Sequence, residues 1–249
     1  MIQRLVTSNP SPDYVERVAR AFNNNGAGVR GDLKAVWVAI FLDDEARGAA
    51  SLANPNFGKL REPMVRFIQW GRTFGLTSGF NSWKVSATTR AEDSLGQSPL
   101  FAPSVFNFFR PGFVPPNTAL AATQATAPEF QLVNETTVGG YLNFMQNVIR
   151  YGIFVPEPSQ APALFRNYQP DVKATYAAEL PLATDAAALV KRLKLLLCAG
   201  QLSPATEKII VDALNANPLT ASSNNDRKLD RIGAAVLLVM SCSEYLVQK

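Results

Sequence analysis

A phenylalanine-rich stretch in the middle of the chain carries the residues best suited to hold a ligand. It reads FNFFRPGF over residues 106–113 and places Asn107 and Arg110 among four aromatic rings. A guanidinium group on a rigid aromatic loop can stack on, or clamp, an anionic or sugar ligand. In the structural interpretation, the rings anchor the segment and Arg110 caps a helix C-terminus or pairs with a carboxylate. We favour the structural interpretation and keep Asn107 and Arg110 as candidate ligand-binding residues.

Two carboxylates, Glu129 and Glu135, flank the end of this stretch. Two carboxyl groups about 5–10 Å apart can hydrolyse a glycosidic bond, one as the acid and the other as base or nucleophile. A second acidic group, Asp43, Asp44 and Glu45, has oxygen ligands that suit Ca²⁺ but lacks EF-hand spacing. Acidic residues at helix ends are usually solvated, and the helix dipole alone accounts for Glu135. We expect no metal site and keep Glu129 and Glu135 as candidate ligand-binding residues.

Other chemistry is limited by the residue types that the sequence lacks. The 249 residues include no histidine, which excludes Ser-His-Asp and Cys-His nucleophilic systems and any zinc site that needs an imidazole. The two cysteines, Cys198 and Cys242, lie on separate apolar helical patterns without CxxC spacing. We therefore favour buried free thiols over a disulfide. No cofactor is expected.

Charge is spread thinly along the chain. The net charge is +4, and 18% of the residues are charged against 47% hydrophobic, which is typical of a globular protein rather than a disordered one. We interpret the basic clusters as polar faces of amphipathic helices and expect no nucleic-acid partner. These clusters are Lys59, Arg61, Arg66 and Arg72, and Lys191, Arg192 and Lys194. We find no signal peptide, and the longest apolar run, Ile232–Met240, is too short to span a bilayer.

Helical periodicity predicts the elements that must position these residues. Apolar residues recur at helical spacing behind capping signals, and no alternating strand pattern of six or more residues occurs. Each apolar stripe is wide enough to need a packing partner. The predicted helices begin after Ser11, after Asp32, at Pro63, near Asn134, after Thr184, at Ser203–Pro204 and at Asp226. The first two stripes are Val15, Val18, Ala19 and Phe22, and Leu33, Val36, Trp37, Ile40 and Phe41.

Residues 96–128 interrupt the helices with prolines and phenylalanines. The prolines prevent a long regular element, and the rings should pin this stretch on the helical body as a long ordered loop with one short helical turn at 104–109. We therefore predict an all-α fold, an irregular multi-helix bundle with a long Pro/Phe-rich ordered loop. Its parts are a helical domain at 1–151 containing this loop, a linker-like stretch at 152–183, and a three-helix subdomain at 184–249 packed on the first.

Five stretches of the sequence carry a family resemblance. They read "RLVTSNPSPDYVERVARAFNNNG", "GDLKAVWVAIFLDDEAR", "KLREPMVRFIQWGRTFG", "LGQSPLFAPSVFNFFRPGFVPP" and "CSEYLVQK". Their order and content resemble the C-terminal half of the uncharacterised bacterial family called domain of unknown function 1800. The N-terminal half of that family, with its histidines, has no counterpart here, and Met1 falls inside what resembles a family helix. We therefore expect a truncated gene, an engineered fragment or one subunit of a split protein.

The resemblance implies a largely helical fold and, because family members are often exported, a periplasmic or extracellular location. It also implies a possible partner, the exported sulfatase-like protein often encoded beside family members. It implies no catalytic residues.

Two functions remain open from the sequence. We favour a non-catalytic structural or interaction module of an envelope-associated protein, bound to a protein partner or to the missing N-terminal half. Such a module should expose a large apolar face. The alternative is a carboxylate-dependent envelope enzyme that acts on a polysaccharide or an ester.

Overall fold

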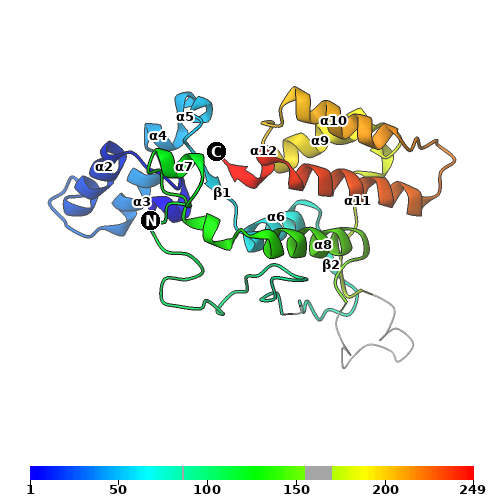
Figure 1. The fold of residues 1–249 in the computed structure, drawn as a ribbon, viewed down its shortest axis with the longest axis horizontal. Helices are drawn as coiled ribbons and strands as arrows, with labels where there is room; N and C mark the ends of the chain where they lie inside the picture. The colour runs from blue at the N-terminus through cyan, green and yellow to red at the C-terminus, as the bar shows by residue number, and fades with distance from the viewer. Residues whose placement is uncertain (86, 155–169) are drawn as a thin grey trace. The chain divides into compact units, whose positions relative to one another are not determined.

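The computed structural model describes residues 1–85, 87–154 and 170–249. This part of the chain is mainly α-helical (Figure 1), which confirms the predicted fold class. The chain forms two compact units. Unit 1 consists of residues 1–61, 103–133 and 247–249, and unit 2 of residues 62–102 and 134–246.

Unit 1 combines short helices with one small antiparallel sheet. Strand β1 pairs with β4, with Lys59 opposite Gln248 and Leu60 opposite Val247. Strands of two residues are too short to produce an alternating pattern, so the sequence does not reveal them. The elements of unit 1 are α1 (Ile2–Leu5), α2 (Pro12–Asn23), α3 (Leu33–Phe41), α4 (Asp44–Arg47), α5 (Ala49–Ala53), β1 (Lys59–Leu60), α7 (Ala119–Ala122), η1 (Pro128–Leu132) and β4 (Val247–Gln248).

Unit 2 holds the longer helices and the larger apolar core. Helix α11 packs against both α8 and α9, and β2 pairs with β3 in an antiparallel sheet. The elements of unit 2 are α6 (Pro63–Thr73), β2 (Leu76–Ser78), α8 (Glu135–Tyr151), β3 (Val172–Ala174), η2 (Leu180–Leu182), α9 (Ala186–Cys198), α10 (Pro204–Asn215), α11 (Asn225–Ser241) and α12 (Ser243–Leu246).

The capping residues explain where the long helices begin. Ser11 accepts a hydrogen bond from the backbone N–H of Tyr14 at 3.1 Å, and Asp32 accepts from the first turn of α3. These contacts satisfy backbone donors that a helix start leaves free. One predicted cap is wrong: Asp185, not Thr184, caps α9, because its carboxylate accepts from the backbone N–H of Ala188 at 3.0 Å.

Two consecutive buried hydrogen bonds link Trp70, Tyr176 and Ile149 in the core of unit 2. Trp70 Nε1 donates to Tyr176 Oη at 2.9 Å, and Tyr176 Oη donates to the carbonyl of Ile149 at 3.0 Å. Burial raises the pKa of Tyr176, which therefore stays a neutral donor. The polar tips of both rings are thus satisfied inside an apolar core.

The boundaries of the two compact units differ from those of the three predicted parts. Contacts place residues 134–246 together in unit 2, since α8 packs against α11. The chain then returns to unit 1 for residues 247–249. Fifteen of the 32 residues of the predicted linker at 152–183, namely residues 155–169, lie outside the described residues.

A carboxylate in the C-terminal part of unit 2 makes its stability depend on pH. Partial burial alone would raise the pKa of Glu244, but hydrogen bonds from Thr206, from its own backbone N–H, from Ser203 and from Ser243 outweigh it and lower this pKa to about 2. The stabilisation is complete above the ordinary value of 4.5 and is lost as pH falls toward 2.

We expect the urea concentration at the unfolding midpoint of unit 2 to decrease as the pH is lowered from 4.5 to 2. We expect this decrease to be smaller in the Glu244→Gln variant. Urea titrations of both proteins across this range measure the difference. The same slope in both proteins would assign the pH dependence to other carboxylates.

Candidate functional site

The two candidate residues of the aromatic stretch lie on its exposed side. Asn107 has a left-handed backbone with φ of 66°, and its N–H donates to the carbonyl of Ser104 at 3.0 Å. Arg110 donates its backbone N–H to Gln131 Oε1 at 2.5 Å, and its guanidinium lies 5.8 Å from the ring of Phe106. The backbone of Arg110 therefore fixes the turn, and its exposed side chain rests near one exposed ring.

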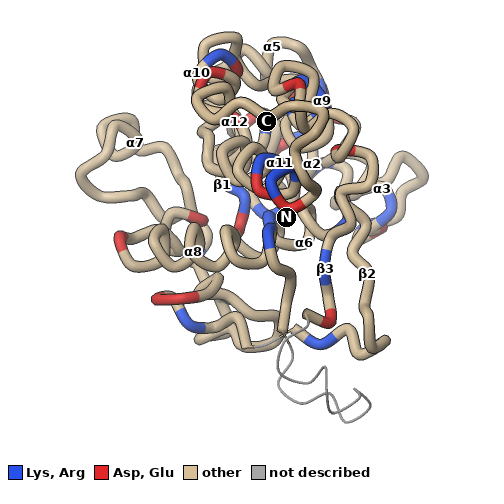
Figure 2. The backbone as a smooth tube through the Cα atoms, turned by 90° about the vertical axis from the view of Figure 1, so that its right-hand side faces the viewer, with Lys and Arg blue, Asp and Glu red and all other residues tan. Residues whose placement is uncertain are grey.

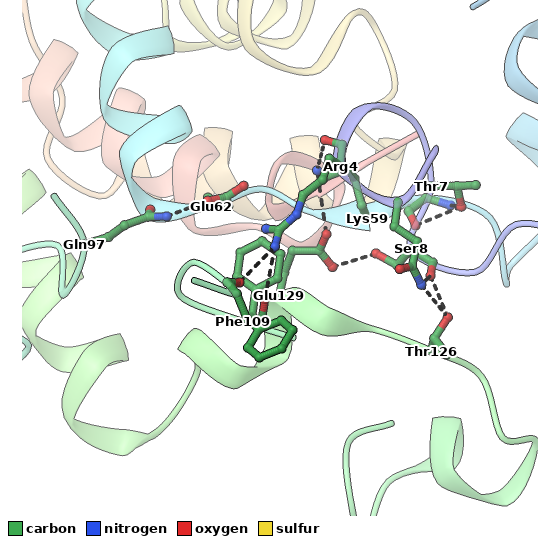
Figure 3. A network of polar contacts seen from close by, with 12 residues as sticks. Arg4, Thr7, Ser8, Lys59, Glu62, Gln97, Phe109, Thr126 and Glu129 are labelled. Carbon is green, nitrogen blue, oxygen red and sulfur yellow. Dashed lines mark hydrogen bonds and ion pairs between the residues drawn. The ribbon is translucent and has the colours of Figure 1, made fainter. Parts of the chain in front are cut away.

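Glu129 lies in a buried polar network within unit 1 (Figure 3). Its Oε2 accepts a hydrogen bond from Ser8 Oγ at 2.7 Å, and its Oε1 lies 3.6 Å from Lys59 Nζ. Lys59 is also buried and donates to the carbonyl of Arg4 at 2.6 Å. The network joins α1, β1 and η1, so Glu129 holds three separate stretches of unit 1 together.

Arg4 is the residue that anchors the aromatic stretch, and the sequence analysis missed it. Its Nη2 donates to the carbonyls of Phe106 and Phe109 at 3.3 and 3.0 Å. The guanidinium also stacks 3.9 Å from the centre of the Phe109 ring (Figure 3). The sequence analysis expected the rings to anchor this stretch and Arg110 to cap a helix or pair with a carboxylate, whereas Arg4 contributes to the anchoring through these contacts. Arg4 and Phe109 are 105 positions apart in the sequence, and no local sequence pattern predicts such a contact.

The rings pin the aromatic stretch less completely than we predicted. Phe109 is buried, whereas Phe101 and Phe106 remain 70% and 52% exposed. The predicted pinning of the stretch by its rings therefore holds for Phe109 and not for Phe101 or Phe106. The short helical turn predicted at 104–109 is a hydrogen-bonded turn, in which the N–H of Asn107 donates to the carbonyl of Ser104. Backbone hydrogen bonds to the Gln131 side chain and from Ala127 to Phe113 hold the stretch as well.

Glu135 has a structural role at the start of α8 in unit 2. It is exposed in the first turn, where a negative charge favours the helix dipole. Asn134 and Thr137 form a reciprocal capping box beside it. Glu129 and Glu135 thus belong to different units, and their surroundings explain each of them without a catalytic role.

The carboxylates of Asp43 and Glu45, in the acidic cluster after α3, also make structural contacts. Asp43 accepts two hydrogen bonds from Arg17, at 2.7 and 2.8 Å, and caps α4. This pairing with Arg17 lowers the pKa of Asp43. Glu45 accepts from the backbone N–H of Ser11 at 2.9 Å. Within the described ranges, no three Cys, Asp or Glu side chains gather as metal ligands.

Four residues of the basic clusters, Lys59, Arg66, Arg192 and Lys194, have acidic or aromatic neighbours. The Arg66 guanidinium lies 3.9 Å from the centre of the Tyr141 ring. Arg192 Nε lies 2.6 Å from a carboxylate oxygen of Glu179. Figure 2 shows Lys and Arg scattered among Asp and Glu in both units. In the parts of the chain that are described, no helix is both long and apolar enough to cross a bilayer.

The most distinctive surface of unit 1 is an apolar face on α2 and α3. The predicted α2 stripe is largely exposed, because Tyr14 rather than Val15 or Phe22 turns into the core. Helix α3 buries only Val36 and Ile40 deeply. The docking face, as we name it, consists of the exposed large apolar side chains of α2 and α3 together with Leu42, the residue that ends α3. These are Val15, Phe22, Leu33, Trp37, Val38, Phe41 and Leu42.

The docking face rests on a rigid pair of helices. Helices α2 and α3 pack on each other, and Tyr14 Oη donates to the carbonyl of Ile40 at 2.5 Å. Burial, aided by the nearby carboxylates, raises the pKa of Tyr14 to about 12, so its hydroxyl stays protonated. The Arg17–Asp43 pair adds a second link between α2 and the end of α3. These contacts hold α2 and α3, which carry the docking face, against each other.

Comparisons with known proteins agree with the resemblance seen in the motifs. A search of curated proteins and a search of solved structures found no match to this chain. A family model described as "Protein of unknown function (DUF1800)" matches residues 1–247. That family has no known activity, and no catalytic residue follows from it. The match covers nearly the whole sequence, and the chain therefore belongs to the DUF1800 family.

Proposed function

We propose that this chain is a non-catalytic interaction module whose docking face binds a protein partner. The observation that carries the proposal is the exposure of large apolar side chains on α3, whose nine residues are apolar except for Lys34. A helix of this composition is typical of a protein interior, yet Leu33, Trp37 and Phe41 keep 56%, 41% and 42% of their surface exposed. Large exposed apolar side chains that lie together on one surface typically mark an interaction site.

The arrangement of these side chains indicates what kind of partner would fit. Leu33, Trp37 and Phe41 follow one another at four-residue spacing and so form one line along α3. The rings of Trp37 and Phe41 stack with their centres 5.5 Å apart. A line of large anchors on a helix suits an apolar groove on another protein. We therefore infer that the partner is a separate chain with an apolar groove.

The family resemblance suggests where to look for this partner. We propose a periplasmic or extracellular partner and regard the exported sulfatase-like neighbour as the first candidate. The carboxylate-dependent enzyme has less support, because Glu129 is enclosed by Ser8 and Lys59 and Glu135 lies at a helix start.

A photoreactive benzoylphenylalanine at position 37 tests the proposal in producing cells. We expect it to capture one partner protein, identifiable by mass spectrometry. The same residue at position 209 is the matched control, since Ile209 is a 68% exposed apolar residue on α10 in unit 2. Equal capture at both positions would contradict a specific docking face.

Affinity measurements with the purified partner then quantify the role of Trp37. Truncating a tryptophan that is buried in an interface typically costs about 2 kcal/mol or more of binding free energy. We therefore expect Trp37→Ala to increase the Kd by about 30-fold. Ile209→Ala should change the Kd by less than about 2-fold, and both variants should melt like the wild type because both side chains are exposed. A Kd unchanged by Trp37→Ala would refute the docking face.

A further inference from the structure

A cavity in unit 2 lies where the end of α8 meets β3. Its volume is about 500 Å³, which is within the range of about 300–1,000 Å³ that is usual for small-molecule sites. All its lining residues belong to unit 2, so it is separate from the docking face of unit 1. The lining of this cavity indicates what kind of molecule it could bind.

Gly152 allows α8 and β3 to approach each other closely beside the cavity. Its φ of 81° lies in the left-handed region. A Cβ atom at this position would lie 2.6 Å from the carbonyl oxygen of Val172 and 2.8 Å from Lys173 Cβ. The backbone N–H of Ile153 donates to the carbonyl of Val172 at 2.7 Å. The backbone thus fixes β3 against the end of α8, and this contact brings Lys173 to the cavity.

The buried part of the lining is apolar. Ile149 and Tyr176 are buried, and Leu229 of α11 packs against the same core. The hydroxyl of Tyr176 already bonds to Trp70 and to the carbonyl of Ile149. This part of the cavity therefore favours an apolar group over a polar one.

The exposed part of the lining is aromatic. Tyr151 and Phe154 line the cavity and are 56% and 48% exposed. The guanidinium of Arg150 lies 5.1 Å from the centre of the Tyr151 ring. Exposed rings of this kind can stack on a ring of a ligand.

The charge of the lining is positive. Arg150 and Lys173 line the cavity, and none of the described lining residues is acidic. Arg150 Nε is paired with Asp230, which compensates much of its charge. Within the described ranges, no carboxylate is paired with Lys173. One uncompensated cation suits a ligand with a single negative charge.

We propose that this cavity binds an aromatic acid, a small molecule in which a short chain joins one carboxylate to an aromatic ring. The carboxylate would pair with Lys173, and the ring would lie against Tyr151 and the buried apolar lining. A neutral aromatic compound would leave Lys173 without a partner. A carboxylate without a ring would leave the apolar lining in contact with water. Both parts of the ligand are therefore needed.

A titration of the purified full chain with 3-phenylpropionate tests the proposal by two-dimensional ¹H–¹⁵N NMR. We expect saturable shifts at the amides of Gly152, Lys173 and Ala174, with a Kd of about 1 mM or lower. Acetate lacks the ring and 3-phenylpropionamide lacks the charge, so each should bind at least about 5-fold more weakly. Shifts that leave these three amides unchanged, or equal binding of the acid and the amide, would overturn the proposal.

Two variants and one matched control separate the contribution of the charge from that of the ring. Lys173→Met should raise the Kd of 3-phenylpropionate about 5-fold and leave that of the amide within about 2-fold. Tyr151→Ala should weaken both compounds about 5-fold, since stacking does not depend on the charge of the ligand. Lys191→Met is the control, because Lys191 is an exposed lysine on α9 that does not line the cavity.

Melting temperatures show whether each variant folds, and we expect wild-type values because all three side chains are exposed. Equal weakening of 3-phenylpropionate by Lys173→Met and Lys191→Met would assign the effect to net charge and refute the role of Lys173. Unchanged binding in Tyr151→Ala would refute the stacking contact.

Discussion

Glu129→Ala is expected to destabilise unit 1 by about 3–5 kcal/mol, the cost typical of breaking a buried ion pair from one side. The substitution removes the carboxylate that faces the ammonium group of Lys59, whose side chain is only 8% exposed. Lys59 would keep its hydrogen bond to the carbonyl of Arg4 but lose its counter-charge. Ser8 would also lose the acceptor for its hydroxyl. Urea unfolding, followed by circular dichroism, measures this loss.

Two further variants show whether the ion pair is the cause. Glu135→Ala removes an exposed carboxylate at a helix start, so we expect a loss of no more than about 1 kcal/mol. Replacing the pair together, as Lys59→Met with Glu129→Leu, should recover part of the stability, because no unpaired charge remains buried. If Glu129→Ala costs no more than Glu135→Ala, the polar network does not hold unit 1 together.

Gly140→Ala is expected to destabilise unit 2 by about 2–3 kcal/mol, a loss in the upper range for overpacked sites. A Cβ atom at Gly140 would lie 1.9 Å from the carbonyl oxygen of Ala91 and 2.9 Å from the carbonyl carbon of Glu92. These are backbone atoms, so neither α8 nor residues 91–92 can yield by rotating a side chain. Helix α8 packs against this stretch through a position that has room only for hydrogen.

The neighbouring glycine gives a matched control in the same helix. Gly139 is exposed, and a Cβ atom there would meet nothing within 4 Å. Alanine is the better helix former, so Gly139→Ala should stabilise unit 2 by about 0.5–1 kcal/mol. Thermal melts of both variants measure the two shifts, and the expected signs are opposite. Destabilisation of similar size by both substitutions would place the cause in α8 itself rather than in its contact with residues 91–92.

The sequence was sufficient to predict the helices whose start is marked by a side-chain cap. Ser11, Asp32 and Ser203 each accept a backbone hydrogen bond from the first turn, as their types suggest. Such caps depend on residues two or three positions apart. The four short strands of the described part of the chain were not predicted, because their pairing joins residues that are distant in the sequence, such as Leu60 and Val247.

Burial was harder to predict than helicity, and the first two helices show why. The spacing of Val15 and Phe22 predicts a buried stripe, and the structure turns Tyr14 inward instead. An apolar stripe indicates only that some surface must cover it, and that surface can belong to another molecule. The surroundings of the candidate site residues were equally hard to predict from the sequence, because the contacts of Glu129 with Ser8 and Lys59 depend on the tertiary fold.

The division of unit 1 among three stretches of sequence affects how it is made in the cell. Strand β1 receives its partner only when residues 247–248 have been synthesised, after the whole of unit 2. During translation β1 therefore remains without its partner strand β4, while the larger helical unit can already fold. Lys249 donates to the carbonyls of Leu52 and Asn54, so this contact also forms only after the residues of unit 2 have been synthesised.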